Sequence, residues 1–162
     1  MLNVLTQKGR EAEESSRAAI LKLSTPEVRF AWFPQTNFYP IDGFRIEGHE
    51  VTGIFEGKSR KASYENGAMV HQQRRYEDYL ITASKLDQGI EMAKQMRADF
   101  LLFVLLELSN HMLVFTIWDE AKQKAIVFKR ARTKTQAGVN GGQVVRENAY
   151  IEIREAQLIA MW

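Results

Sequence analysis

The feature that most limits how this chain can fold is an uninterrupted apolar run, FLLFVLL, at residues 100–106. The run is far shorter than the roughly 20 residues that a membrane-spanning helix requires. Alternate side chains of a β-strand point to opposite faces, so a strand that is apolar throughout has both faces covered. We therefore expect residues 100–108 to form an inner strand of a sheet with a packed layer on each side.

Two amphipathic segments are expected to form helices that pack on this sheet. Residues 4–23 place their apolar side chains on one stripe opposite a charged face, and the segment ends before Pro26. Residues 83–98 repeat the pattern directly after Thr82, a residue type that commonly caps the N-terminus of a helix. Each segment therefore offers one apolar face to the sheet.

Short runs with strand character make up most of the remaining chain. We expect strands at residues 28–34, 38–46, 51–59, 111–118, 125–132 and 144–153. Gly48 fits a hairpin turn between the second and third of these runs, whereas residues 60–81 are polar and have no clear assignment. The order α, β, β, β, α, β, β, β, β predicts one α/β or α+β domain over residues 1–162, with a central mixed β-sheet flanked by two helices.

The composition excludes several kinds of site. The chain has 162 residues and no cysteine, which rules out disulfides, thiolate zinc sites, iron–sulfur clusters and a cysteine nucleophile. Its three histidines, His49, His71 and His111, are too far apart in sequence to predict a histidine-rich metal site. The N-terminal residues lack the apolar segment of a secretory signal. We therefore expect a cytoplasmic protein with no membrane association and no organic cofactor.

Asp42, Glu56 and Lys58 are the candidates for catalysis. Residues i and i+2 of a strand share a face, so Glu56 and Lys58 project together, and a hairpin through Gly48 brings Asp42 beside them. Two carboxylates offer the hard oxygen ligands that Mg²⁺ or Mn²⁺ prefers, and a lysine beside such an ion stabilises negative charge on a phosphate. A structural salt bridge between Glu56 and Lys58 is the alternative interpretation.

The order of these residues resembles the PD-(D/E)XK nuclease superfamily, and within it the archaeal Holliday-junction resolvases. Those proteins open with a Gly-Arg-x-x-Glu helix start, which corresponds to residues 9–13 (GREAE). A proline–aspartate element follows, represented by Asp42 with Pro40 displaced by one position, and then a Glu-x-Lys strand, represented by residues 56–58 (EGK). The likeness covers residues 7–108 and implies a restriction-endonuclease-like αβββαβ core with extra C-terminal strands.

The resemblance implies a Mg²⁺- or Mn²⁺-dependent deoxyribonuclease and a role for each matching residue. Asp42 and Glu56 would bind the metal ion together with the backbone carbonyl of Gly57. Lys58 would orient the attacking water or help to deprotonate it. These are the groups that phosphodiester hydrolysis needs, because it requires an activated water, a Lewis acid and charge compensation.

The first helix is implied to contribute one further carboxylate. Glu13 would complete the metal site, directly or through a water on the metal, with Glu14 and Glu11 as alternatives. Glu11 and Glu13 lie about 200° apart around a helix, so only one of them can face the site. Resolvases of this kind act as two-fold dimers on branched DNA, so the resemblance also implies a homodimer and a junction-like DNA substrate.

Basic residues in two segments are candidates for contacts with the DNA backbone. Residues 121–146 contain seven Lys or Arg and no acid, and residues 58–79 interleave basic side chains with tyrosines that can stack on bases. The candidates in these segments and at the start of the second helix are Arg60, Lys61, Gln72, Arg74, Arg75, Tyr76, Lys85, Arg130, Arg132 and Lys134. A solvated surface without a partner is the alternative for each of them.

Two other functions also fit the sequence. Gln72 and Tyr76 match the Gln-x-x-x-Tyr signature of the RecB-like nucleases, which are often exonucleases, if they share a face of a helix; a DNA-contacting loop fits the segment equally. A non-catalytic nucleic-acid-binding protein is the third candidate, although clustered carboxylates repel DNA unless a cation lies between them. The apolar residues 156–162 are expected to dock on the domain or on a second copy.

Overall fold

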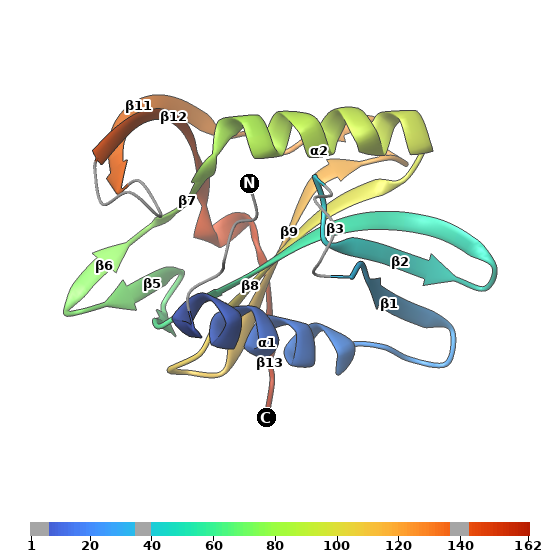
Figure 1. Cartoon of the computed structure of the whole chain (residues 1–162), viewed down its shortest axis with the longest axis horizontal. Helices are drawn as coiled ribbons and strands as arrows, with labels where there is room; N and C mark the ends of the chain where they lie inside the picture. The colour runs from blue at the N-terminus through green and yellow to red at the C-terminus, as the bar shows by residue number, and fades with distance from the viewer. Residues whose placement is uncertain (1–6, 35–39, 137–142) are drawn as a thin grey trace.

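A central sheet of seven strands lies between two helices in the computed structural model, which describes residues 7–34, 40–136 and 143–162 (Figure 1). Its order is β1-β2-β3-β8-β9-β10, and β13 also pairs with β9. Because β3 and β8 are parallel and their neighbours are antiparallel, the sheet is mixed, as predicted. The strands are β1 (Val28–Trp32), β2 (Gly43–Glu47), β3 (Glu50–Arg60), β8 (Asp99–Leu106), β9 (His111–Asp119), β10 (Lys124–Ala125) and β13 (Gln157–Ala160).

Strand β8 is the inner strand that the apolar run predicts. Its even-numbered residues from 100 to 106 belong to a buried cluster that contains Leu86 of α2 (Ala83–Met96). Its residues 101, 103 and 105 belong to a second cluster, which contains Ile20 of α1 (Gln7–Leu21). The two helices therefore cover opposite faces of the sheet, and Figure 1 shows them above and below it.

Both helices are shorter than the apolar periodicity predicts. Helix α1 ends at Leu21, and residues 4–6 of the expected helix lie outside the described residues. Helix α2 ends at Met96 because Arg97 adopts the left-handed conformation, with φ of 55°, and its amide donates a hydrogen bond to the carbonyl of Lys94. Thr82 occupies the N-cap position of α2, but its side chain makes no capping hydrogen bond.

The strands of the first half differ from the prediction mainly at their ends. The hairpin through Gly48 is confirmed: β2 and β3 are antiparallel, and Gly48 has a φ of 62°. Strand β1 ends at Trp32 rather than at residue 34. Strand β2 begins at Gly43 rather than at residue 38, and residues 38 and 39 lie outside the described residues.

The unassigned residues 60–81 form four short strands. They are β4 (Ser63–Glu65), β5 (Ala68–His71), β6 (Arg74–Tyr76) and β7 (Asp78–Thr82). β4, β5 and β6 make a small antiparallel sheet of their own. Strands of three to five residues are too short to display a reliable alternation of polar and apolar side chains, which is why the pattern gives no assignment here.

A third sheet contains the basic segment. β7 pairs with β12 (Gln143–Glu152), which pairs with β11 (Lys129–Gln136). The prediction of a single strand at residues 125–132 is therefore wrong, because residues 126–128 belong to no strand and separate β10 from β11. The glycines at 138, 141 and 142 lie outside the described residues.

The C-terminal segment packs on its own domain, which is one of the two arrangements expected for residues 156–162. β13 pairs antiparallel with β9, and a short 3-10 turn, Ile153–Glu155, joins it to β12. This four-residue strand has three exposed side chains and no alternation of polar and apolar residues, so its sequence does not predict it. Neither described helix has the length and apolarity that crossing a membrane requires.

Candidate functional site

The hairpin places Asp42 beside the middle of β3. Asp42 lies directly before β2, and its amide donates a hydrogen bond to the carbonyl of Phe55, at 2.8 Å. Its carboxylate Oδ2 accepts a hydrogen bond from the amide of Gly57, also at 2.8 Å. The convergence of Asp42 with residues 56–58 that the sequence predicts is thus present, through contacts of both its backbone and its side chain.

Glu56 lies on the α2 face of the sheet. Its neighbour Phe55 belongs to the cluster under α1, so alternation directs Glu56 and Lys58 to the opposite face. Glu56 is 2% exposed. Its Oε1 lies 3.1 Å from the ammonium of Lys58 and 2.9 Å from that of Lys85. A buried carboxylate is therefore compensated by two ammonium groups, which come from β3 and from α2.

Helix α2 reaches Glu56 because it packs closely on β8. A Cβ atom built on Gly89 would lie 2.1 Å from the ring of Phe100, so only glycine permits this separation of helix and strand. The first turn of α2 then presents Lys85 to Glu56. The sequence interpretation left open whether Lys85 lies near the site or in solvent, and the structure places it in the site.

The charges around Asp42 change its protonation. The pKa of Asp42 is raised from 3.8 to about 6, chiefly by burial and then by the nearby negative charge of Glu56. The hydrogen bond from Gly57 and the positive charges of Lys58 and Lys85 act against this rise. Asp42 is consequently ionised at neutral pH but takes up a proton in mildly acidic solution.

Glu13 does not form a direct metal-binding group with Asp42 and Glu56 among the described residues. Among the described residues there is no group of three or more His, Asp or Glu side chains placed to hold a metal ion. The physical reason is the layering: Glu13 belongs to α1, which covers the face of Phe55, whereas Glu56 points to the face of α2. The alternatives Glu11 and Glu14 are exposed on the same helix. Two carboxylates, those of Asp42 and Glu56, therefore lie together, and a contribution of Glu13 through a bound water stays a prediction.

The two carboxylates still fit a divalent metal ion. Among the described residues, the hydrogen bond and ion pairs of the two carboxylates are made by Oδ2 of Asp42 and Oε1 of Glu56. The amide of Gly57 and the carbonyl of Phe55 both point to the edge where Asp42 lies, and the carbonyl of Gly57 points to the same edge. Mg²⁺ is commonly held by one or two carboxylates, with water and substrate phosphate as its other ligands.

The contacts of the predicted DNA-binding residues after β3 differ from one residue to the next. Arg60 lies on the same face as Lys58, with its guanidinium 5.3 Å from the centre of the Tyr79 ring. Lys61 and Arg74 are exposed. The guanidinium of Arg75 donates hydrogen bonds to two backbone carbonyls, which restrains it at the surface.

The helical Gln-x-x-x-Tyr motif is wrong. Gln72 has a φ of 49° and lies in the turn between β5 and β6, while Tyr76 ends β6. A helix is excluded there because the left-handed conformation of Gln72 and Gln73 reverses the chain. Of the two interpretations of this segment, only the non-helical one agrees with the structure.

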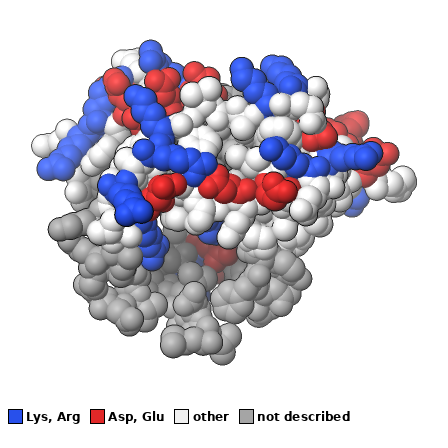
Figure 2. Space-filling view, turned by 90° about the horizontal axis from the view of Figure 1, so that it is seen from above, with Lys and Arg blue, Asp and Glu red and all other residues white. Residues whose placement is uncertain are grey.

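Only some of the basic side chains of β11 are available to bind a polyanion. Arg130 pairs with Asp87 of α2 at 2.6 Å and with Glu147 of β12 at 3.2 Å, and these carboxylates raise its pKa. Arg132 is exposed and forms no ion pair with the described residues, while the side chain of Lys134 is outside the described part. Figure 2 shows this mixture of basic and acidic side chains on the α2 side of the molecule.

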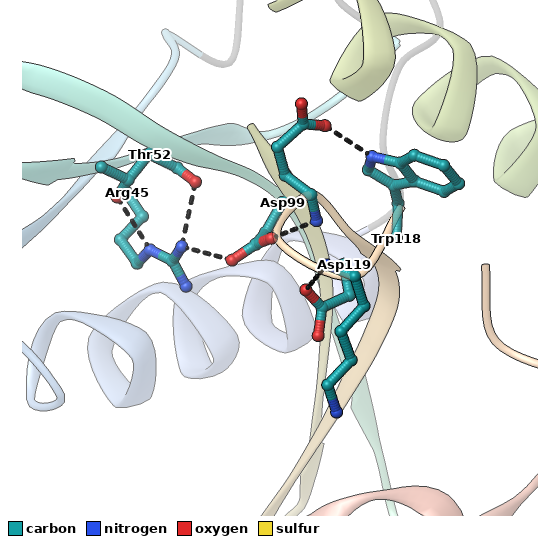
Figure 3. Close-up of polar contacts among 7 residues, drawn as sticks. Arg45, Thr52, Asp99, Trp118 and Asp119 are labelled. Atoms are coloured by element: carbon teal, nitrogen blue, oxygen red, sulfur yellow. Dashed lines mark hydrogen bonds and ion pairs between the residues drawn. The ribbon is translucent and has the colours of Figure 1, made fainter. Parts of the chain in front are cut away.

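A second polar cluster, away from Asp42, has a structural role. The guanidinium of Arg45 donates to the carbonyl of Thr52 at 2.9 Å and to Asp99 at 2.7 Å (Figure 3). The other oxygen of Asp99 accepts the amide of Glu120, whose carboxylate accepts the indole N–H of Trp118. These groups satisfy one another at the start of β8 and help to hold the parallel register of β3 and β8.

No family model, curated protein or solved structure matches this chain. The chemical groups of the site are two carboxylates, two ammonium groups and a strand carbonyl.

Proposed function

We propose that the protein is a Mg²⁺-dependent DNA endonuclease of the PD-(D/E)XK type, which hydrolyses phosphodiester bonds. The observation that carries this proposal is the meeting of Asp42, Glu56 and Lys58 at one point of the sheet. Burial of a carboxylate is costly, and a second carboxylate beside it adds repulsion. Such a cluster is typical of a site that binds a cation and a negatively charged substrate.

The order of the elements supports the same superfamily. Helix α1 and strands β1–β3 precede α2 and β8, and β3 and β8 are parallel neighbours. This agrees with the αβββαβ order of a restriction-endonuclease-like core. In that interpretation β4–β7 are an insertion before the second helix, and the strands after β8 are additions to the core.

Each residue has a distinct role in the proposed reaction. Asp42, Glu56 and the carbonyl of Gly57 would hold Mg²⁺ or Mn²⁺, which when bound supplies a Lewis acid for the phosphate and activates water. Lys58 would orient the attacking water and stabilise the negative charge that develops on the phosphate. Lys85 holds Glu56 and compensates its charge. Water is the nucleophile, so no covalent intermediate is required.

We also propose that the substrate is branched or junction-like DNA and that the protein acts as a homodimer. This part rests on the likeness to resolvases, in which two strands are cut symmetrically. The helical Gln-x-x-x-Tyr motif that suggested the exonuclease alternative is not formed, because Gln72 lies in a turn. A non-catalytic DNA-binding protein is the alternative that the following experiment distinguishes.

The experiment is a cleavage assay on closed circular, linear, single-stranded and four-way-junction DNA, with Mg²⁺, Mn²⁺ or EDTA. We expect cleavage of closed circles and of the junction with either metal ion and none with EDTA. Asp42→Asn and Glu56→Gln should abolish cleavage, whereas Glu50→Gln, an exposed carboxylate on the same strand, should not. Binding without cleavage by the wild-type protein would contradict the proposal and favour the non-catalytic alternative.

A further inference from the structure

A groove lined by tyrosines includes Arg60, which lies two residues after the proposed catalytic lysine on β3. It has a volume of about 470 Å³, within the range of roughly 300–1,000 Å³ of typical ligand sites. Its aromatic and basic lining consists of Arg60, Arg75, Tyr76, Tyr79 and Tyr150. We call this surface the tyrosine groove.

Four different strands build the tyrosine groove. Arg60 ends β3, two residues after Lys58 and on the same face. Tyr79 belongs to β7, and Tyr150 of β12 is the register partner of Leu80 in β7. Tyr76 comes from β6, the last strand of the small sheet. Tyr79 therefore lies under Arg60 of β3, whereas the accessible rings of the groove are those of Tyr76 and Tyr150.

Tyr79 is the most unusual residue in the groove. It is 1% exposed, and its buried hydroxyl has no hydrogen-bond partner among the described residues. Buried tyrosine hydroxyls are normally paired, and an unpaired one costs free energy. The guanidinium of Arg60 covers its ring at 5.3 Å. Burial raises the pKa of this hydroxyl to about 12.

We propose that the tyrosine groove binds an unpaired nucleobase of the DNA, next to the phosphate that is cleaved. The inference rests on the proposed function for the position of that phosphate. The exposed ring of Tyr76 and the half-buried ring of Tyr150 can stack on any base, and Arg60 extends the positive charge of Lys58 along the path that a DNA backbone would follow. Glu77 and Asp78, which also line the groove, offer acceptors for the amino group of a base.

The groove thereby defines a class of DNA substrate. A base in a continuous duplex is stacked between its neighbours and paired, so it cannot enter a groove between protein side chains without first leaving the helix. Branch points, flaps and bulges present unpaired bases at little cost. The preferred substrate is therefore DNA with an unpaired nucleotide beside the scissile bond.

The test measures binding without cleavage, by fluorescence anisotropy in EDTA. Three labelled duplexes are compared: fully paired, with one bulged base, and with an abasic bulge of the same backbone. We expect the wild-type protein to bind the bulged base about tenfold more tightly than the other two, which is within the range that stacking of one base on an aromatic side chain contributes to affinity. Tyr76→Leu should remove this preference and leave binding of the paired duplex unchanged.

The control variant is Trp162→Leu, which replaces an exposed aromatic residue outside the groove. It should keep the preference, and circular dichroism should show all variants folded. Equal binding of the bulged and abasic duplexes by the wild-type protein, or an equal loss on all three in Tyr76→Leu, would overturn the inference. Preference for the bulged base without any cleavage would contradict the proposed nuclease and leave the groove assignment standing.

Discussion

The ammonium of Lys85 in α2 lies 2.9 Å from Oε1 of Glu56 in β3, the same oxygen that Lys58 approaches at 3.1 Å. A lysine in the first turn of a helix opposes the helix dipole, so its position there needs a compensating contact. The buried carboxylate of Glu56 provides one. The contact also ties the helix to the strand that carries the proposed catalytic residues.

Lys85→Met is therefore expected to lower stability through Glu56 specifically. Lys85 is partly exposed, so we expect a loss of only about 1 kcal/mol in the free energy of unfolding. In a Glu56→Gln background the same substitution should have little effect, because the charge that Lys85 compensates is gone. Urea unfolding of the four proteins measures the coupling. Equal losses in both backgrounds would show that Lys85 acts independently of Glu56.

Asp42 is expected to make stability depend on pH. Its pKa is about 6 in the folded protein and near 3.8 in the unfolded chain, so the folded state binds more protons between these values. The contribution of this group to stability is fully present below about pH 3.8 and is lost as the pH rises through 6. Asp42→Asn removes the ionised form, so we expect it to melt at a higher temperature than the wild-type protein at pH 7.5.

The same titration governs the effect of a metal ion. Mg²⁺ requires the ionised carboxylate, so it should raise the melting temperature of the wild-type protein at pH 7.5 and much less at pH 5. Asp42→Asn should show no increase at either pH. Thermal melts with and without Mg²⁺ at both pH values check this. An equal increase in Asp42→Asn would place the metal ion elsewhere.

Lys58→Met is expected to affect the chemical step more than DNA binding. Removing one positioned electrostatic contact commonly lowers a rate by about 10²–10³-fold. Glu56 keeps Lys85 as a partner in this variant, so the site should remain folded. Single-turnover cleavage rates at saturating protein, together with Kd in EDTA, separate the two effects. A rate within about threefold of wild type would show Lys58 to be a structural salt-bridge residue.

The part of the site that lies on one hairpin is predictable from the sequence. The two-residue period of β3 puts Glu56 and Lys58 on one face, and the turn at Gly48 brings Asp42 to the same strand. Both are local rules that need no knowledge of the rest of the fold. The inner position of β8 is predictable for a similar reason, since an apolar strand has to be covered on both faces.

The groups that reach the site from other elements are not predictable in this way. Lys85 meets Glu56 because of how closely α2 packs on β8, which includes the close approach of Gly89 to Phe100. Glu13 is expected at the site from its place in a motif, but α1 covers the other face of the sheet. Tertiary packing decides both cases, and neither helix shows in its own periodicity which face it will cover.

Arg132 is expected to contribute more to DNA binding than Arg130, although both lie on one face of β11. The sequence alone predicts equal contributions from Arg130, Arg132 and Lys134, because alternation puts them together and Lys129 on the other face. The ion pairs of Arg130 with Asp87 and Glu147 change this, since its charge is already compensated.

Arg132→Ala should reduce the slope of log Kd against log salt by about one unit for duplex DNA, the value for one lost phosphate contact. Arg130→Ala should change the slope much less, and Lys129→Ala is the control on the opposite face. Titrations at several salt concentrations measure all three slopes. If none of them changes, β11 is a solvated edge, and the DNA path must instead follow the residues after β3.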